Sequence, residues 1–457
     1  MVVDRSIVFV TVMMKIGLVF MKKSRIWEII MFKTLAWKMK FQIPFIGIDG
    51  CFLKGPFRGM LMSAVRLDGN NGFYPFTVAV VESETNDSWK WFLDHLHKFL
   101  GDTATNMPWT FMSDGQKGIL TALSAIFAQA ITRRCCKHIY ANFRTRWPGV
   151  KYKKLFWEAI NAYNEEDFKI AMRQIESISQ DASNWLMEHP LETWTRHKFD
   201  DRVKCDYVTN NHVESFNSWL GNVRAKPITA VFECIRTKLM SKFNKRFQRT
   251  TDWTTIVVPK IKRRLNSNIS KVGTCELTWP AEVVYEVTDN AKQKSYIVML
   301  GERTCCCREW QVSGVPCMHA CAAITTTRVD IEKLCSDFYN KDTYTKTYTP
   351  FIHPMRHESM WTEVEKPELD PLEFKRPCGR PRMSRKREDG EAEARKRSTV
   401  VQCSVCGHFG HNKRGCQKLL LQKRLQVGQQ QQKQLKANQH KALRLHVAPG
   451  SRTYKHH

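Results

Sequence analysis

The sequence predicts an α/β fold, in which a mixed sheet covered by helices carries an all-helical insertion and is followed by small cysteine- and histidine-rich modules and a disordered basic tail. Three observations lead to this prediction. Short apolar runs alternate with amphipathic stretches over residues 41–255, residues 151–190 show only helical periodicity, and two later segments concentrate cysteine and histidine. With 457 residues the chain is long enough for two or three folded units.

Three strands are expected at the start of this region, because short apolar runs there are separated by turn residues. They lie in PFIGIDGCFLKG, GMLMSAVRLDG and GFYPFTVAVVESE. Residues 68–72, with the sequence DGNNG, form the expected hairpin turn between the last two. Helices and strands then alternate, in DSWKWFLDHLHKFL, PWTFMSDG, QKGILTALSAIF and QAITRRCCKHIYANFR. A meander followed by such an alternation indicates a mixed sheet with helices on its faces.

The next stretch is expected to be wholly helical, because apolar residues at helical spacing form one stripe before residues 164–166 and another after them. We expect both stripes to be core. Helices resume in NNHVESFNSWLGNVR and after Pro227. These features place a helical insertion at about residues 148–205, inside a core of residues 41–255.

Residues 1–40 carry no clear structural pattern. Their apolar stretch is short for a membrane span and contains Lys15. We expect a poorly specified remnant left by a missing N-terminal domain. A weak signal peptide is the less favoured alternative, because no convincing cleavage site follows and secretion would bring metal-binding thiols into an oxidising compartment.

Composition points to a polyanionic partner. The formal net charge is +28, and no basic amphipathic helix with a broad apolar face stands out, so nucleic acid is favoured over a membrane surface. The sixteen cysteines cluster with metal-ligand spacing, which indicates a reducing compartment, either cytosol or nucleus.

Three acidic residues are candidates for a metal-dependent catalytic site. Asp49 lies within an apolar strand, Asp114 ends another strand, and Glu214 begins a helix. A carboxylate inside a strand is costly unless it is paired or metal-bound. Three such oxygen donors at one sheet edge suit two Mg²⁺ ions about 4 Å apart, which can activate an attacking oxygen and stabilise a leaving oxygen. Spacing alone makes this a weak signal among 44 acidic residues.

Five phrases, in order, resemble plant Mutator-like (MULE/MuDR) transposases: FIGIDGCFLKG, VVESETNDSWKWFL, SDGQKGIL, CCKHIYANFR and NNHVESFNSWL. The resemblance implies an RNase H-like core whose D-D-E triad falls on Asp49, Asp114 and Glu214, with Mg²⁺ or Mn²⁺ as cofactor for DNA cleavage and strand transfer. It also implies a C-x-x-H pair near the active site, at Cys135 and His138. The alternative for that pair is a buried cysteine beside a capping histidine. A homo-oligomer is compatible with the resemblance, without a fixed number of subunits.

A structural zinc site is expected within residues 256–350. The segment TCCCREWQVSGVPCMHACAAI has the spacing C-x-C-x9-C-x-H and resembles a SWIM zinc finger. Alternation along a strand predicts that Cys305 and Cys307 face one metal while Cys306 points away. Cys317 and His319 complete the expected set from the start of a helix. Reactive or merely buried thiols are the competing interpretation.

A second zinc site is expected in residues 401–418, where the spacing C-x2-C-x4-H-x4-C resembles retroviral-type zinc knuckles. Its expected ligands are Cys403, Cys406, His411 and Cys416. Phe409 would project from this knuckle and stack on an unpaired base. The alternative is a zinc staple that only supports the fold or a protein partner.

The basic linker, residues 351–400, contains a Gly-Arg-Pro-Arg core that resembles an AT-hook. Its Arg380 and Arg382 are expected to enter a narrow minor groove. A charged linker that serves mainly as a nuclear import signal is the alternative. The Gln-rich basic tail, residues 419–457, is expected to be disordered.

Three functions remain open from the sequence. The first is a Mutator-like transposase or its derivative, located in the nucleus and binding DNA and zinc. The second is a non-catalytic DNA-binding regulator derived from such an enzyme. The third is a protein that binds RNA through its knuckle. The intact acidic triad favours catalytic potential, whereas the missing N-terminal domain argues against transposition.

Overall fold

The structure is a computed structural model that describes residues 28–31, 43–55, 58–100, 107–281, 284–349, 352, 403, 405–406 and 416–417. Its contacts divide the chain into two units, Met1–Gly379 and Arg380–His457. Within the described residues, no helix has both the length and the apolarity needed to cross a bilayer.

A six-stranded mixed sheet lies at the centre of the first unit, with the order β1-β4-β3-β2-β5-β6. The strands are β1 (Glu28–Met31), β2 (Phe45–Phe52), β3 (Met60–Leu67), β4 (Phe73–Val81), β5 (Thr110–Ser113) and β6 (Ile131–Arg134). Strands β2, β3 and β4 form an antiparallel meander, whereas β5 is parallel to β2 and β6 is parallel to β5. Without β1, this is the RNase H-like order, so the predicted fold class is confirmed.

Strand β1 lies in the N-terminal stretch where no element was expected. It pairs antiparallel with β4, with Glu28 opposite Val80 and Met31 opposite Thr77. The strand therefore extends the sheet at the edge that the meander would otherwise leave free, and it covers the backbone hydrogen-bonding groups of β4.

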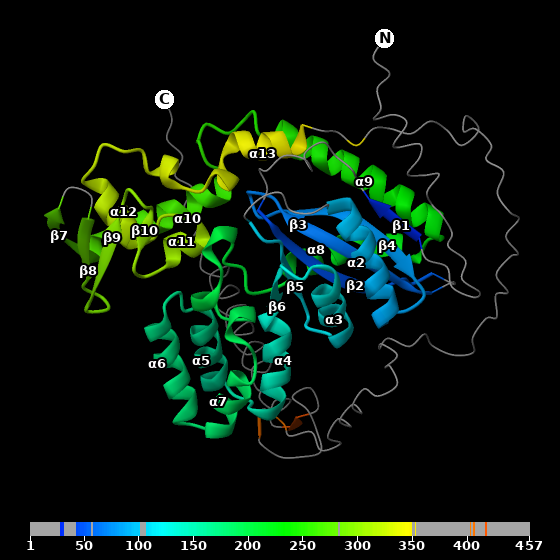
Figure 1. Cartoon of the computed structure of the whole chain (residues 1–457), viewed down its shortest axis with the longest axis horizontal. Coiled ribbons are helices and arrows are strands. Elements are labelled where there is room, and N and C mark those ends of the chain that lie inside the picture. The colour runs from blue at the N-terminus through cyan, green and yellow to red at the C-terminus, as the bar shows by residue number, and fades with distance from the viewer. Residues whose placement is uncertain are drawn as a thin grey trace, which may run out of the picture. The chain divides into compact units, whose positions relative to one another are not determined.

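Helices cover both faces of this sheet (Figure 1). They are α2 (Asn86–Leu100), α3 (Lys117–Ile126), α8 (Asn211–Leu220) and α9 (Ile228–Gln248). Residues an odd number apart on a strand face opposite sides, so two glycines of β2 identify the faces. A side chain at Gly50 would point toward Trp89 of α2, whereas one at Gly47 would meet α8.

The predicted helical insertion is confirmed and has its own hydrophobic core. After α4 (Cys136–Arg146) it comprises α5 (Val150–Asn161), α6 (Glu165–Glu176) and α7 (Gln180–Met187), which pack side by side (Figure 1). Asn164 caps α6 by accepting from the Asp167 backbone N–H, and Ser179 caps α7 in the same way. Trp194 is fully buried in this core.

The C-terminal part of the first unit contains a small antiparallel sheet of order β10-β9-β8-β7. Its elements are α10 (Pro259–Ile269), β7 (Cys275–Ala281), β8 (Val284–Asp289), β9 (Lys294–Met299), β10 (Thr304–Cys305), α11 (Glu309–Ser313), α12 (Met318–Thr325) and α13 (Lys341–Tyr348). Single-turn and short 3-10 helices complete the unit: Leu191–Thr193, Arg196–Lys198, Asp201–Val203, Gly221–Ala225, Val272–Thr274, Ile331–Leu334 and Asp337–Tyr339. Residues of α10 and α13, among them Leu265 and Tyr348, are buried in the same core as the six-stranded sheet.

Candidate metal centres

Four buried side chains meet in the small C-terminal sheet. The donor atoms of Cys305, Cys307, Cys317 and His319 all lie within 4.8 Å of one another. Cys305 ends β10, Cys317 is the N-cap of α12, and His319 lies in the first turn of α12. The Nδ1 atom of His319 is 3.7 Å from the Cys305 sulfur and 3.9 Å from the Cys317 sulfur. Three thiols and one imidazole form a closed tetrahedral zinc site.

A second layer of residues orients the histidine of this site. Its Nδ1 atom faces the thiols, while its Nε2 atom is 3.9 Å from Oδ2 of Asp289. Both of these last two atoms are buried, and neither makes a hydrogen bond, so they are left facing one another. Tyr296 stacks on the imidazole, with ring centroids 3.9 Å apart. A carboxylate behind a ligating imidazole fixes the tautomer and makes the ligand more basic.

The predicted zinc ligands are correct, although one reason for choosing them was wrong. Strand β10 ends at Cys305, so Cys307 reaches the cluster from a turn rather than by strand alternation. Cys306 is exposed, as expected, and its sulfur accepts a hydrogen bond from the Ile297 backbone N–H.

The second unit contains a cysteine triad. The sulfur atoms of Cys403, Cys406 and Cys416 lie within 4.8 Å of one another, and two of these residues are buried. The fourth predicted ligand, His411, lies outside the described residues, as do Phe409, Arg380 and Arg382. Three converging thiols are suited to zinc.

The predicted acidic residues lie near the carboxyl end of the central parallel strand pair β2 and β5, a region that we call the acidic edge. Asp49 is on β2, and its Oδ2 atom accepts a hydrogen bond from the Asn217 side-chain amide at 2.9 Å. Burial, together with the charges of Asp114 and Glu84, raises the pKa of the Asp49 carboxyl to about 7. Asp49, Asp114 and Glu214 do not bring one oxygen each within 4.8 Å of the other two among the described residues, so the structure groups the two aspartates without closing the predicted D-D-E set.

Asp114 follows β5 directly, and its Oδ1 atom accepts from the Gln116 backbone N–H at 3.1 Å. Between these residues Gly115 has a φ of +85°, a conformation that favours glycine. The imidazole of His138 lies close enough to Asp114 and Asp49 for their negative charges to stabilise its protonated form. The pKa of His138 is raised, chiefly by its hydrogen bond to Cys135 and further by the two carboxylates. Partial burial acts in the opposite direction but does not outweigh them.

Glu214 makes contacts different from those of the two aspartates. Its Oε2 atom forms a 2.5 Å ion pair with the ammonium group of Lys137. Its carboxylate also lies within 4.8 Å of the Cys135 sulfur and a His138 ring nitrogen. The structure therefore brings all five predicted residues to one region, and it directs Glu214 toward the Cys-His pair.

Helix α8 can approach β2 closely because residue 47 is glycine. A Cβ atom there would lie 2.3 Å from Asn210 Oδ1, 2.3 Å from His212 Nε2 and 2.4 Å from Val213 Cγ2. The Asn210 side chain also donates to the Ile48 carbonyl at 3.1 Å. This close contact positions Glu214 at the sheet edge.

Sequence reasoning missed three residues of this site: Glu84, Lys137 and Asn217. A signal existed for Asn217, because it lies three residues after Glu214 and therefore on the same face of the helix. Glu84 and Lys137 had none, since neither their neighbours nor their spacing distinguishes them from other surface charges.

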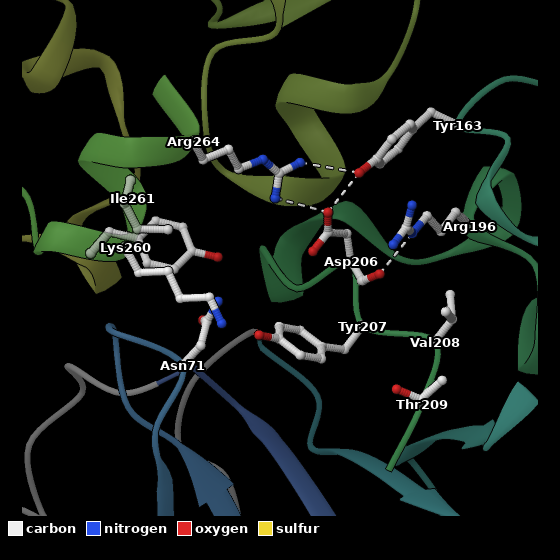
Figure 2. A pocket seen from close by; sticks show the side chains of 11 residues that line it. Asn71, Tyr163, Arg196, Asp206, Tyr207, Val208, Thr209, Lys260, Ile261 and Arg264 are labelled. Carbon is white, nitrogen blue, oxygen red and sulfur yellow. Dashed lines mark hydrogen bonds and ion pairs between the residues drawn. The ribbon is translucent and has the colours of Figure 1, made fainter. Parts of the chain in front are cut away.

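A polar cleft of about 480 Å³ lies where the insertion meets α10 and the β3–β4 turn. Figure 2 shows the Asp206 carboxylate between Arg264 and Tyr163, with ion-pair and hydrogen-bond distances of 2.9 and 2.6 Å. Arg264 also pairs with Glu309 at 3.0 Å, and Arg196 donates to the Asp206 carbonyl at 2.8 Å. These interactions join the helical insertion, the segment before α8 and the C-terminal helices α10 and α11.

Comparison with protein families gives two matches. Residues 45–142 match the MULE transposase domain, a range that runs from β2 into α4 and includes Asp49 and Asp114 but not Glu214. Residues 296–327 match the SWIM zinc finger and include all four buried ligands. No curated protein matches the chain. The chain therefore carries a MULE transposase domain and a SWIM zinc finger, which together indicate a transposase-derived zinc-binding protein.

Proposed function

We propose that this protein is a Mutator-like transposase, or a derivative of one, that binds DNA in the nucleus and cleaves it at the edge of the RNase H-like sheet. The observation that carries the proposal is the raised pKa of Asp49, caused by burial and by the neighbouring acids Asp114 and Glu84. Carboxylates held together against their own repulsion are typical of a site that binds divalent cations.

In this proposal Asp49 and Asp114 hold Mg²⁺ or Mn²⁺, and Glu214 completes the set. These residues would hold ions whose chemistry, when bound, would be to polarise the phosphodiester and the attacking oxygen. Asn217 keeps the Asp49 carboxylate in place through its 2.9 Å hydrogen bond. The net charge of +28 would attract the DNA backbone, with a binding affinity that falls steeply as salt rises.

A second candidate is a DNA-binding regulator without catalytic activity. It is favoured by the 2.5 Å ion pair between Lys137 and Glu214, which occupies the third acidic residue. In that case the zinc modules and the basic linker would account for binding, and the acids would be inherited features of the fold.

The test is Mg²⁺- or Mn²⁺-dependent cleavage and strand transfer on terminal-repeat DNA, with Asp49→Asn as the variant. We expect a rate loss of more than about a hundredfold, since even outer-layer partners of metal ligands cost ten- to a hundredfold. The exposed acid Asp181, on α7, gives a matched control as Asp181→Asn. Full activity in Asp49→Asn would refute the catalytic assignment.

Binding over a salt series separates the alternatives. Tight, salt-dependent binding of duplex DNA without cleavage by the wild-type protein would select the regulator. A preference for single-stranded RNA over duplex DNA would select recognition through the knuckle.

A further inference from the structure

A third group of potential metal ligands lies beside the acidic edge, where the N-termini of α4 and α8 meet. Cys135 is the N-cap of α4, His138 lies in its first turn, and Glu214 lies in the first turn of α8. One donor atom from each lies within 4.8 Å of the other two. The cysteine is fully buried, the histidine is exposed, and the glutamate side chain is 35% exposed, so the cluster opens to solvent on one side.

We propose that Cys135, His138 and Glu214 form a third zinc site, with three protein ligands and an open position. Sulfur, nitrogen and oxygen donors together suit zinc better than Mg²⁺, which prefers oxygen alone. Tetrahedral zinc bonds of about 2.0–2.3 Å place donors roughly 3.3–3.8 Å apart. Because the donors lie no more than 4.8 Å apart, the cluster would have to contract by at most about 1.5 Å, which a rotation of the exposed side chains can supply.

Two of the three ligands are already held by the main chain. The Cys135 backbone N–H donates to the Ser113 carbonyl at 2.7 Å, and the Cys135 sulfur accepts from the Asn210 backbone N–H at 3.2 Å. One helical turn places His138 beside Cys135, and the His138 backbone N–H donates to the Cys135 carbonyl at 3.0 Å. Zinc would therefore meet a thiol and an imidazole whose backbones need not move.

Glu214 is the ligand that must change partner. Its carboxylate pairs with Lys137, whose side chain is 54% exposed, so zinc competes with the ammonium group of that residue. Zinc binding would also hold Glu214 away from Asp49 and Asp114. We therefore expect Zn²⁺ to oppose the Mg²⁺-dependent reaction proposed above, although zinc binding itself does not depend on that reaction.

The experiment uses the full-length chain with its two cysteine-rich modules loaded with zinc, and titrates Co²⁺ as the probe. We expect one further equivalent of Co²⁺ to bind, with a thiolate-to-cobalt absorption band. Cys135→Ser should abolish the band, and Glu214→Gln should weaken binding at least about tenfold. Cys234→Ser, which changes a half-buried thiol on α9, is the matched control and should bind as the wild type does.

Lys137→Ala provides a readout that a merely structural cluster would not give. Removing the competing ammonium should tighten Co²⁺ binding about two- to fivefold, the range expected for an exposed ion pair. The site is refuted if no third equivalent binds, or if Cys135→Ser and Glu214→Gln both bind Co²⁺ as tightly as the control. Glu214→Gln keeps the test decisive if Cys135→Ser fails to fold, because the glutamate is partly exposed and the change preserves its shape.

Discussion

Replacing Gly47 by alanine tests the contact that positions the acidic edge. The added methyl group would lie 2.3–2.4 Å from side-chain atoms of Asn210, His212 and Val213, well inside van der Waals contact. Helix α8 would have to move outward, which also stretches the hydrogen bond from Asn210 to the Ile48 carbonyl.

The expected loss of stability follows from these two effects. Overpacking a core costs about 1–3 kcal/mol, and losing a buried hydrogen bond adds about 0.5–1.5 kcal/mol, so Gly47→Ala should destabilise the fold by roughly 1.5–4.5 kcal/mol. Urea unfolding followed by tryptophan fluorescence measures this difference. Gly273→Ala is the control, because no heavy atom lies within 4 Å of its added Cβ.

If the free energies of unfolding of Gly47→Ala and Gly273→Ala differ by less than about 0.5 kcal/mol, the packing argument fails, because substitutions at the surface have effects of that size. The placement of Glu214 by a close helix–strand contact would fail with it.

Further predictions concern the cleft and the SWIM site. Burial acts to raise the pKa of Asp206, but Arg264 and Arg196 outweigh it and hold the pKa well below its usual range. The resulting stability is present above the unfolded-state pKa of about 4 and is lost as pH falls below it. Asp206→Asn should therefore cost roughly 3 kcal/mol at pH 7, measured by urea unfolding, and the difference from the wild type should shrink in acid; an undiminished difference at low pH would contradict this. Cys317→Ser should lower the zinc content by one equivalent by mass spectrometry, and an unchanged content would exclude that ligand. Asp289→Asn should keep the zinc but weaken its binding about ten- to a hundredfold in chelator competition, and unaltered affinity would rule out its orienting role.

The sequence was informative where local pattern decides structure. Short apolar runs separated by turn residues located β2, β3 and β4, and cysteine spacing located all four ligands of the SWIM site. Strand β1 was missed because four residues carry little periodicity, and because it is stabilised by β4, a partner about fifty positions away. The turn that carries Cys307 was missed for a related reason, since where a strand ends depends on its neighbour.

The acidic edge shows the same limit. Motif match located Asp49, Asp114 and Glu214, but side-chain partners depend on how α4 and α8 approach each other. Lys137 contacts Glu214, and Asn217 contacts Asp49, only because the fold brings these segments together. The pairing of Glu214 with Lys137 could not be read from either local segment.

The single guanidinium of Arg264 has a practical consequence for dissecting the molecule. It joins Tyr163 of the insertion, Asp206 of the segment before α8 and Glu309 of the zinc-bearing part. A fragment cut near residue 255, where motif boundaries would suggest, removes the Arg264 ion pair from the buried Asp206 and leaves only Arg196 as a positive neighbour. It also removes Leu265 and Tyr348 from the core. The RNase H-like and zinc-bearing parts should therefore be produced as one polypeptide.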